Sequence, residues 1–162
     1  MLLMVGDRLR EMLDKLHREL DRYREVAGCD NDEPVALMEL VDQLKDSAFN
    51  AAVTAWHLGD WVFNDMTPDQ RRAVGVKTLG DLQTHARNSC RALYLCRYAA
   101  TASKHSEVNS HPDPKVNVVV SCDDSGWAAH FVDDGKTRPA DQVFAEALEF
   151  WTGFIYQNRI GK

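Results

Sequence analysis

The strongest pattern in the chain is VALMELVDQLKDSAFNAAVTAWHLGDWVFN, residues 35–64. Its apolar residues recur at alternating steps of four and three, the periodicity of an α-helix with one buried face. They are Leu37, Val41, Leu44, Ala48, Ala51, Ala55, Leu58 and Val62. A second apolar stripe widens this face, which is typical of a helix at the centre of a bundle.

Further helices are expected on both sides of this stretch. Residues 1–26 carry a narrow, heptad-like apolar stripe among many charges, and residues 35–103 contain the central helices. The segment 115–133 has the β-branched runs and central turn of a β-hairpin, and 139–158 begins with a proline and continues as an apolar helix. The sequence therefore predicts a mainly α protein with a single domain, 1–162. We expect a bundle of about four long helices with one β-hairpin before the last helix.

Within the central region, two capping motifs mark helix starts. Thr67 and Gln70 form a predicted capping box that opens a short helix or turn. Thr78 and Asp81 open a helix that we expect to run without interruption to about Ser103.

Composition limits the classes of function. The 162 residues carry a net charge of −6, so no overall positive field attracts nucleic acid, and we expect no DNA partner. No run approaches the roughly 18 apolar residues of a membrane span, so we expect no membrane contact and a cytoplasmic location. The four cysteines lack the spacing of a zinc site and are expected to be buried or half-buried thiols. They are Cys29, Cys90, Cys96 and Cys122.

Two polar clusters on the central helices are the candidates for chemistry. One consists of Asn50, Thr54, His57 and Asp60, and the other of Arg97, Thr101, Lys104 and His105. Spacings of three and four place each cluster along one helix face, so the two could meet inside the bundle. Such a set is either a structural hydrogen-bond network or a functional site, and the sequence leaves both open.

The chemistry of each cluster has two interpretations. Asp60 lies one turn from His57 and can fix its tautomer, as a general base requires, or the two can simply satisfy each other. A cation at Arg97 beside the imidazole of His105 suits phosphate stabilisation and proton transfer. Positive charge at Lys104 and His105 is also favourable near a helix C-terminus without any function. His57, Asp60, His85 and His105 lack the spacing of known metal motifs, and we expect neither metal nor cofactor.

Four short motifs carry a resemblance to known proteins. They are Ala55-Trp56-His57-Leu58-Gly59-Asp60-Trp61, Cys96-Arg97, Ala102-Ser103-Lys104-His105 and Ala147-Leu148-Glu149-Phe150-Trp151. Together they resemble a group of uncharacterised bacterial and phage-associated helical proteins. The overall plan is similar to the HEPN superfamily, helical bundles of toxin and antiphage systems. Many of these are dimeric, metal-independent RNases with an arginine and a histidine separated by four to six residues. The nearest equivalent here is Arg97 and His105, with seven residues between them.

Two functions are therefore carried forward, and whether the protein is an enzyme is left open. We favour a non-catalytic interaction or accessory module, whose polar clusters are structural. The alternative is a HEPN-like, metal-independent RNase of a toxin or phage-defence system. In that case Arg97 would stabilise the phosphate, His105 would act as general acid or base, and His57 with Asp60 would orient it. Residues that would support binding are Asn50, Thr54, Thr101 and Lys104.

The expected partners are a second copy of the chain and RNA or another protein. The homodimer is suggested by the narrow apolar stripe of the first helix, which is also compatible with one more helix of an ordinary bundle. The HEPN-like resemblance implies a dimer as well.

Overall fold

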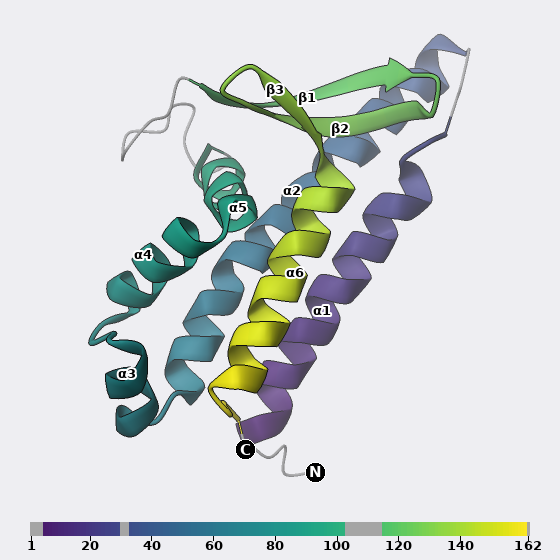
Figure 1. Ribbon diagram of the computed structural model, residues 1–162. Coiled ribbons are helices and arrows are strands. Elements are labelled where there is room, and N and C mark those ends of the chain that lie inside the picture. The colour runs from purple at the N-terminus through teal and green to yellow at the C-terminus, as the bar shows by residue number, and fades with distance from the viewer. Residues whose placement is uncertain (1–4, 30–32, 103–114, 162) are drawn as a thin grey trace.

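The computed structural model describes residues 5–29, 33–102 and 115–161. Within these ranges the chain forms six helices and three strands (Figure 1). In chain order they are α1 (Val5–Val26), α2 (Pro34–Asp65), α3 (Pro68–Val74), α4 (Leu79–Ser89), α5 (Arg91–Ala102), β1 (Val116–Asp123), β2 (Gly126–Asp133), β3 (Lys136–Pro139) and α6 (Ala140–Gln157). The fold is mainly α with a small antiparallel sheet before the last helix, as the sequence predicted.

Helix α2 is the centre of the bundle. It packs against α1 and α6 along its length and against α4 and α5 on another side (Figure 1). The predicted stripe is buried from Leu44 to Val62, whereas Leu37 and Val41 near its start are only half-buried. Three alanines of the stripe, Ala48, Ala51 and Ala55, are almost completely buried, and their small side chains let neighbouring helices approach closely.

The prediction of one continuous helix from Thr78 to about Ser103 is wrong, because the helix is interrupted at Cys90. The backbone of Cys90 is extended, with φ −135° and ψ 108°, and separates α4 from α5. Asn88 and Ser89 precede the break and are weak helix formers. The backbone N–H groups of Ala92 and Leu93, at the start of α5, favour the charged form of the Cys90 thiol, but burial has the larger effect and raises its pKa. Both capping boxes are confirmed, at Thr67 and at Thr78.

The sheet lies across one end of the bundle, and α1 begins and α6 ends at the opposite end (Figure 1). Strands β1 and β2 form the predicted hairpin, with Val116 opposite Asp133 and Asp123 opposite Gly126. The third strand, β3, pairs with the other edge of β2 and was not predicted. It is only four residues long and leads directly into α6, so its residues read as part of a loop in the sequence.

Tyr23, near the end of α1, ties the helices to the sheet. Its hydroxyl donates to the Ala129 carbonyl at 3.2 Å and accepts from the Ala129 N–H at 2.9 Å. Burial raises the pKa of Tyr23 above its ordinary value, so the hydroxyl stays protonated and can donate. Just after α1, the Gly28 N–H donates to the Trp127 carbonyl at 2.9 Å, which extends the contact with β2.

The apolar stripe of α1 packs into the core of the bundle. Leu9, Leu16, Leu20 and Tyr23 are all at most 3% exposed and belong to the single buried hydrophobic cluster of the described residues. This part of the stripe therefore packs within the bundle, as in one more bundle helix.

The cysteines differ from the expected pattern. Cys29 and Cys122 are exposed, because they lie in the segment after α1 and near the end of the edge strand β1. Cys90 is half-buried and Cys96 is buried, and burial raises the pKa of both thiols. Over the described ranges, no helix combines the length and apolar character needed to cross a membrane.

Candidate functional site

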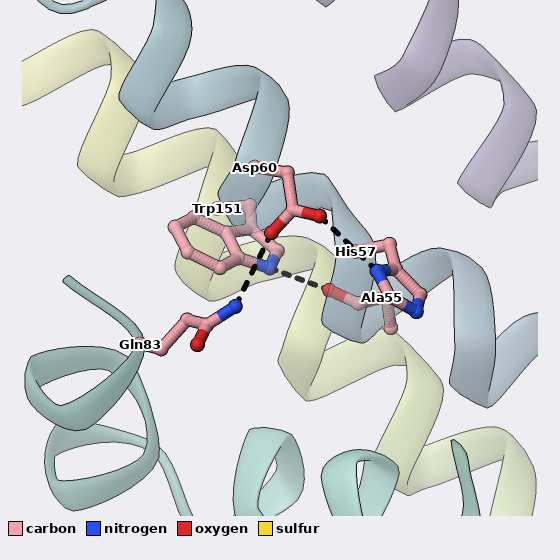
Figure 2. Close-up of polar contacts among 5 residues, drawn as sticks. All are labelled: Ala55, His57, Asp60, Gln83 and Trp151. Atoms are coloured by element: carbon pink, nitrogen blue, oxygen red, sulfur yellow. Dashed lines mark hydrogen bonds and ion pairs between the residues drawn. The ribbon is translucent and has the colours of Figure 1, made fainter. Parts of the chain in front are cut away.

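The best-defined polar contact of the predicted site joins His57, Asp60 and Gln83 (Figure 2). The His57 Nδ1 lies 3.2 Å from Asp60 Oδ2, one turn along α2. The Gln83 side-chain amide of α4 donates to the other Asp60 oxygen, Oδ1, at 3.2 Å. The side chains of His57 and Asp60 are 37% and 36% exposed, so the pair lies at the surface of the bundle. Asp60 therefore connects α2 to α4 while it also orients the imidazole.

The other half of the α2 cluster is directed toward α1. The Lys15 ammonium donates to the Thr54 hydroxyl at 3.2 Å, and Thr54 is only 2% exposed. Asn50, one turn earlier, is exposed. The predicted stripe is thus divided between two neighbours, since Thr54 contacts α1 and Asp60 contacts α4.

The second cluster is described only in part. Thr101 donates its hydroxyl to the Arg97 carbonyl at 2.8 Å, a bond within α5 that leaves its side chain tied to its own helix. Arg97 is half-buried, and its pKa is lowered first by burial and then by the nearby positive charge of Arg87 on α4. Lys104 and His105 lie outside the described residues.

Arg87 and Arg97 place two guanidinium groups on the neighbouring helices α4 and α5, and the charge of Arg87 contributes to the lowered pKa of Arg97. Guanidinium groups donate in a fork that matches a phosphate or a carboxylate.

A close contact beneath Asp60 explains the glycine in the motif Trp56-His57-Leu58-Gly59-Asp60-Trp61. A Cβ added to Gly59 would lie 3.3 Å from the indole ring of Trp151 on α6. The same indole donates its Nε1–H to the Ala55 carbonyl at 2.9 Å (Figure 2). The motif therefore has a packing role, since it seats the buried Trp151 against α2.

No described group of three His, Cys, Asp or Glu side chains is arranged to hold a metal ion. His85, on α4, packs instead near Phe154, with ring centroids 5.9 Å apart. His130 lies on β2 beside Ser121, with the Ser121 hydroxyl 3.2 Å from its Nδ1.

Three contributors to these contacts were not singled out by the sequence: Lys15, Gln83 and Arg87. Each lies on a helix among many other charged or polar residues, and no spacing marks it. Only the packing of α1 and α4 against α2 selects Lys15 and Gln83. Arg87 approaches Arg97 because α4 and α5 meet at the break at Cys90.

The fold and this site define a helical bundle that is closed at one end by a small antiparallel sheet. No protein-family model matches the chain, and no curated protein or solved structure shows significant similarity to it. The resemblance to HEPN proteins therefore stays a prediction.

Proposed function

We propose that this chain is a non-catalytic interaction module of the cytoplasm. One observation carries the proposal: two polar side chains of the α2 cluster, Thr54 and Asp60, join α2 to its neighbouring helices. Thr54 bonds to Lys15 on α1, and Asp60 bonds both to His57 and to Gln83 on α4. A structural role accounts for Thr54 and Asp60 without a substrate, because polar groups inside a bundle are normally hydrogen-bonded to their neighbours.

The partner that we propose first is a second copy of the chain. Two large apolar side chains, Val35 and Met38, are 72% and 70% exposed. They are three residues apart in the first turns of α2, so they share a face of the helix. A two-fold interface brings the same patch of both copies together, and methionine adapts well to such contacts.

Sedimentation equilibrium tests this partner directly. The wild-type chain should associate to a dimer as its concentration rises, and Met38→Asp should weaken this association because it places a charge in the apolar contact. Gln43→Asp is the matched control, since it adds the same charge at an exposed position of α2 on another face. Its association should equal that of the wild type. A wild-type chain that stays monomeric, or a Gln43→Asp variant as weak as Met38→Asp, would contradict the proposal.

The second candidate is a metal-independent RNase, favoured by the two neighbouring cations Arg87 and Arg97. In this alternative the guanidinium of Arg97 stabilises the phosphate, and His105 transfers the proton, with the HEPN-like resemblance as its further support. RNA cleavage in EDTA by the wild type, lost in Arg97→Ala and in His105→Ala without a change in melting temperature, would establish it. Equal cleavage by all three proteins would exclude this site.

A further inference from the structure

A cavity of about 340 Å³ lies between the first half of α2, the end of α5 and the β1–β2 hairpin. Its walls are mostly apolar, with Phe49 from α2, Val118 from β1 and Phe131 from β2 among them. Pockets that bind small molecules run from roughly 300 to 1,000 Å³, so this one is at the lower end of that range. His57, Asp60 and Arg97 are not among its lining residues, so the cavity is distinct from the polar clusters described above.

The polar groups around the cavity are hydrogen-bond donors. Lys45 is the one charged residue among the described lining residues, and Tyr98 contributes a phenolic hydroxyl. Asn117 contributes a side-chain amide whose Oδ1 already accepts the Val118 N–H at 2.8 Å. The amide nitrogen, with its two N–H donors, is therefore the end of Asn117 that can serve a ligand.

Among the residues that the structure describes, the charge of Lys45 has only a weak ion pair. Its Nζ lies 3.8 Å from Asp42 Oδ1, and the two side chains are 61% and 74% exposed. An exposed pair at that distance contributes little, so exchanging it for a ligand carboxylate costs little. An apolar cavity whose lining also includes Lys45, Tyr98 and Asn117 suits a molecule with an apolar body and one anionic head.

We propose that this cavity binds a small amphipathic monocarboxylate, with its aliphatic or aromatic body against Phe49, Val118 and Phe131. Its carboxylate is held by Lys45, with Asn117 and Tyr98 as additional donors. A small ligand suits a pocket of this size, which is at the lower end of the range for small-molecule sites. The site is separate from the proposed dimer contact at Val35 and Met38, so neither proposal depends on the other.

Titration of the full-length, isotope-labelled chain by NMR tests this proposal, with 4-phenylbutyrate as the probe. Saturable shifts should appear in the amide signals of residues around the cavity, such as Ala99 and Val120. The neutral 4-phenylbutanamide, which has the same shape, should bind about twofold to fivefold more weakly because it lacks the charge pair with the exposed Lys45. Acetate, which has the carboxylate without the apolar part, should produce no saturable shifts over the same range of concentrations.

Two variants and one control make the result specific. Lys45→Met should reduce the affinity for 4-phenylbutyrate to that of the neutral amide and leave the amide's own affinity unchanged. Ala99→Phe should fill the cavity and weaken both probes, with a thermal melt to confirm that the variant folds. Lys77→Met is the control. It removes an exposed lysine from the segment between α3 and α4, and this variant should bind the probe like the wild type.

Any of three results would overturn the proposal. The first is the absence of saturable shifts with 4-phenylbutyrate. The second is equal affinity of the wild type and Lys45→Met for that probe. The third is a set of shifts that lies away from the cavity, which would mean that the probe binds elsewhere on the chain.

Discussion

The indole of Trp151, on α6, lies against Gly59 of α2 and donates a hydrogen bond to Ala55, one turn earlier on α2. Its Nε1–H donates to the Ala55 carbonyl at 2.9 Å, and its ring occupies the space that a Cβ at Gly59 would approach to 3.3 Å. Trp151 is 1% exposed. The contact between α2 and α6 thus combines close packing with a buried hydrogen bond.

Replacing this tryptophan should lower stability. Trp151→Phe removes part of a buried ring and the indole donor, so the free energy of unfolding should fall by about 2 kcal/mol. Urea unfolding measures the change. Trp61→Phe is the matched control, because Trp61 is 36% exposed, and it should change stability by less than about 0.5 kcal/mol. Equal effects of the two substitutions would contradict this description of the core.

The turn between β1 and β2 depends on a glycine. Gly126 has φ +95°, and a Cβ there would lie 2.6 Å from the Gly28 carbonyl oxygen. Gly126→Ala should therefore lower the free energy of unfolding by about 2–4 kcal/mol, from backbone strain and from the clash together. Gly135→Ala separates the two causes, since Gly135 has φ +77° with nothing within 4 Å of an added Cβ. It should cost about 1–2 kcal/mol, the conformational part alone. If it costs as much as Gly126→Ala, the approach of Gly28 has no energetic role.

Stability should depend on pH through the ion pair that joins α5 to the sheet. Arg91 Nε donates to Asp133 Oδ2 at 2.9 Å, and a second bond joins Arg91 to Oδ1. These bonds lower the pKa of Asp133 below its ordinary value. A lowered pKa in the folded state stabilises the protein above the unfolded value of about 3.9, and the stabilisation is lost as the pH falls through the folded value.

The corresponding measurement is urea unfolding of the wild type and Asp133→Asn at pH 7 and at about pH 3. The variant should be about 1 kcal/mol less stable at pH 7, and the difference should shrink in acid. Asp134→Asn removes the same charge from a side chain that is 71% exposed and should have a smaller effect at pH 7. A difference between wild type and Asp133→Asn that is independent of pH would refute the assignment.

The cysteines should react in the order of their exposure. Cys29 and Cys122 are exposed and should be alkylated first by iodoacetamide in the native protein. Cys96 is buried and its pKa is raised by burial, so it should react only after unfolding. Peptide mass spectrometry over time distinguishes these sites. Labelling of Cys96 at the rate of Cys29 would show that the core opens readily in the native state.

Much of the fold could be predicted because helix periodicity, capping boxes and β-branched runs are local signals. The stripe of α2, the boxes at Thr67 and Thr78 and the hairpin all depend on residues a few positions apart. The break at Cys90 was missed because apolar residues continue on both sides of it. The strand β3 was missed because its pairing partner, β2, and not its own composition, makes it a strand.

The candidate site was harder to predict, because it depends on which helices become neighbours. Spacing placed Thr54 and Asp60 on related faces of α2, and the structure directs one to Lys15 and the other to Gln83. The cavity at Lys45 left no signal at all in the sequence, since its walls come from α2, α5 and two strands.

We propose that the polar residues of the α2 cluster join helices and that neither they nor Arg97 perform chemistry. The most direct test is RNA cleavage in EDTA by the wild type and Arg97→Ala, with thermal melts of both. We expect no cleavage by either protein and a melting temperature about 2–4 °C lower for Arg97→Ala, because the substitution removes the packing of a half-buried side chain. Cleavage by the wild type that disappears in Arg97→Ala at an unchanged melting temperature would contradict the claim.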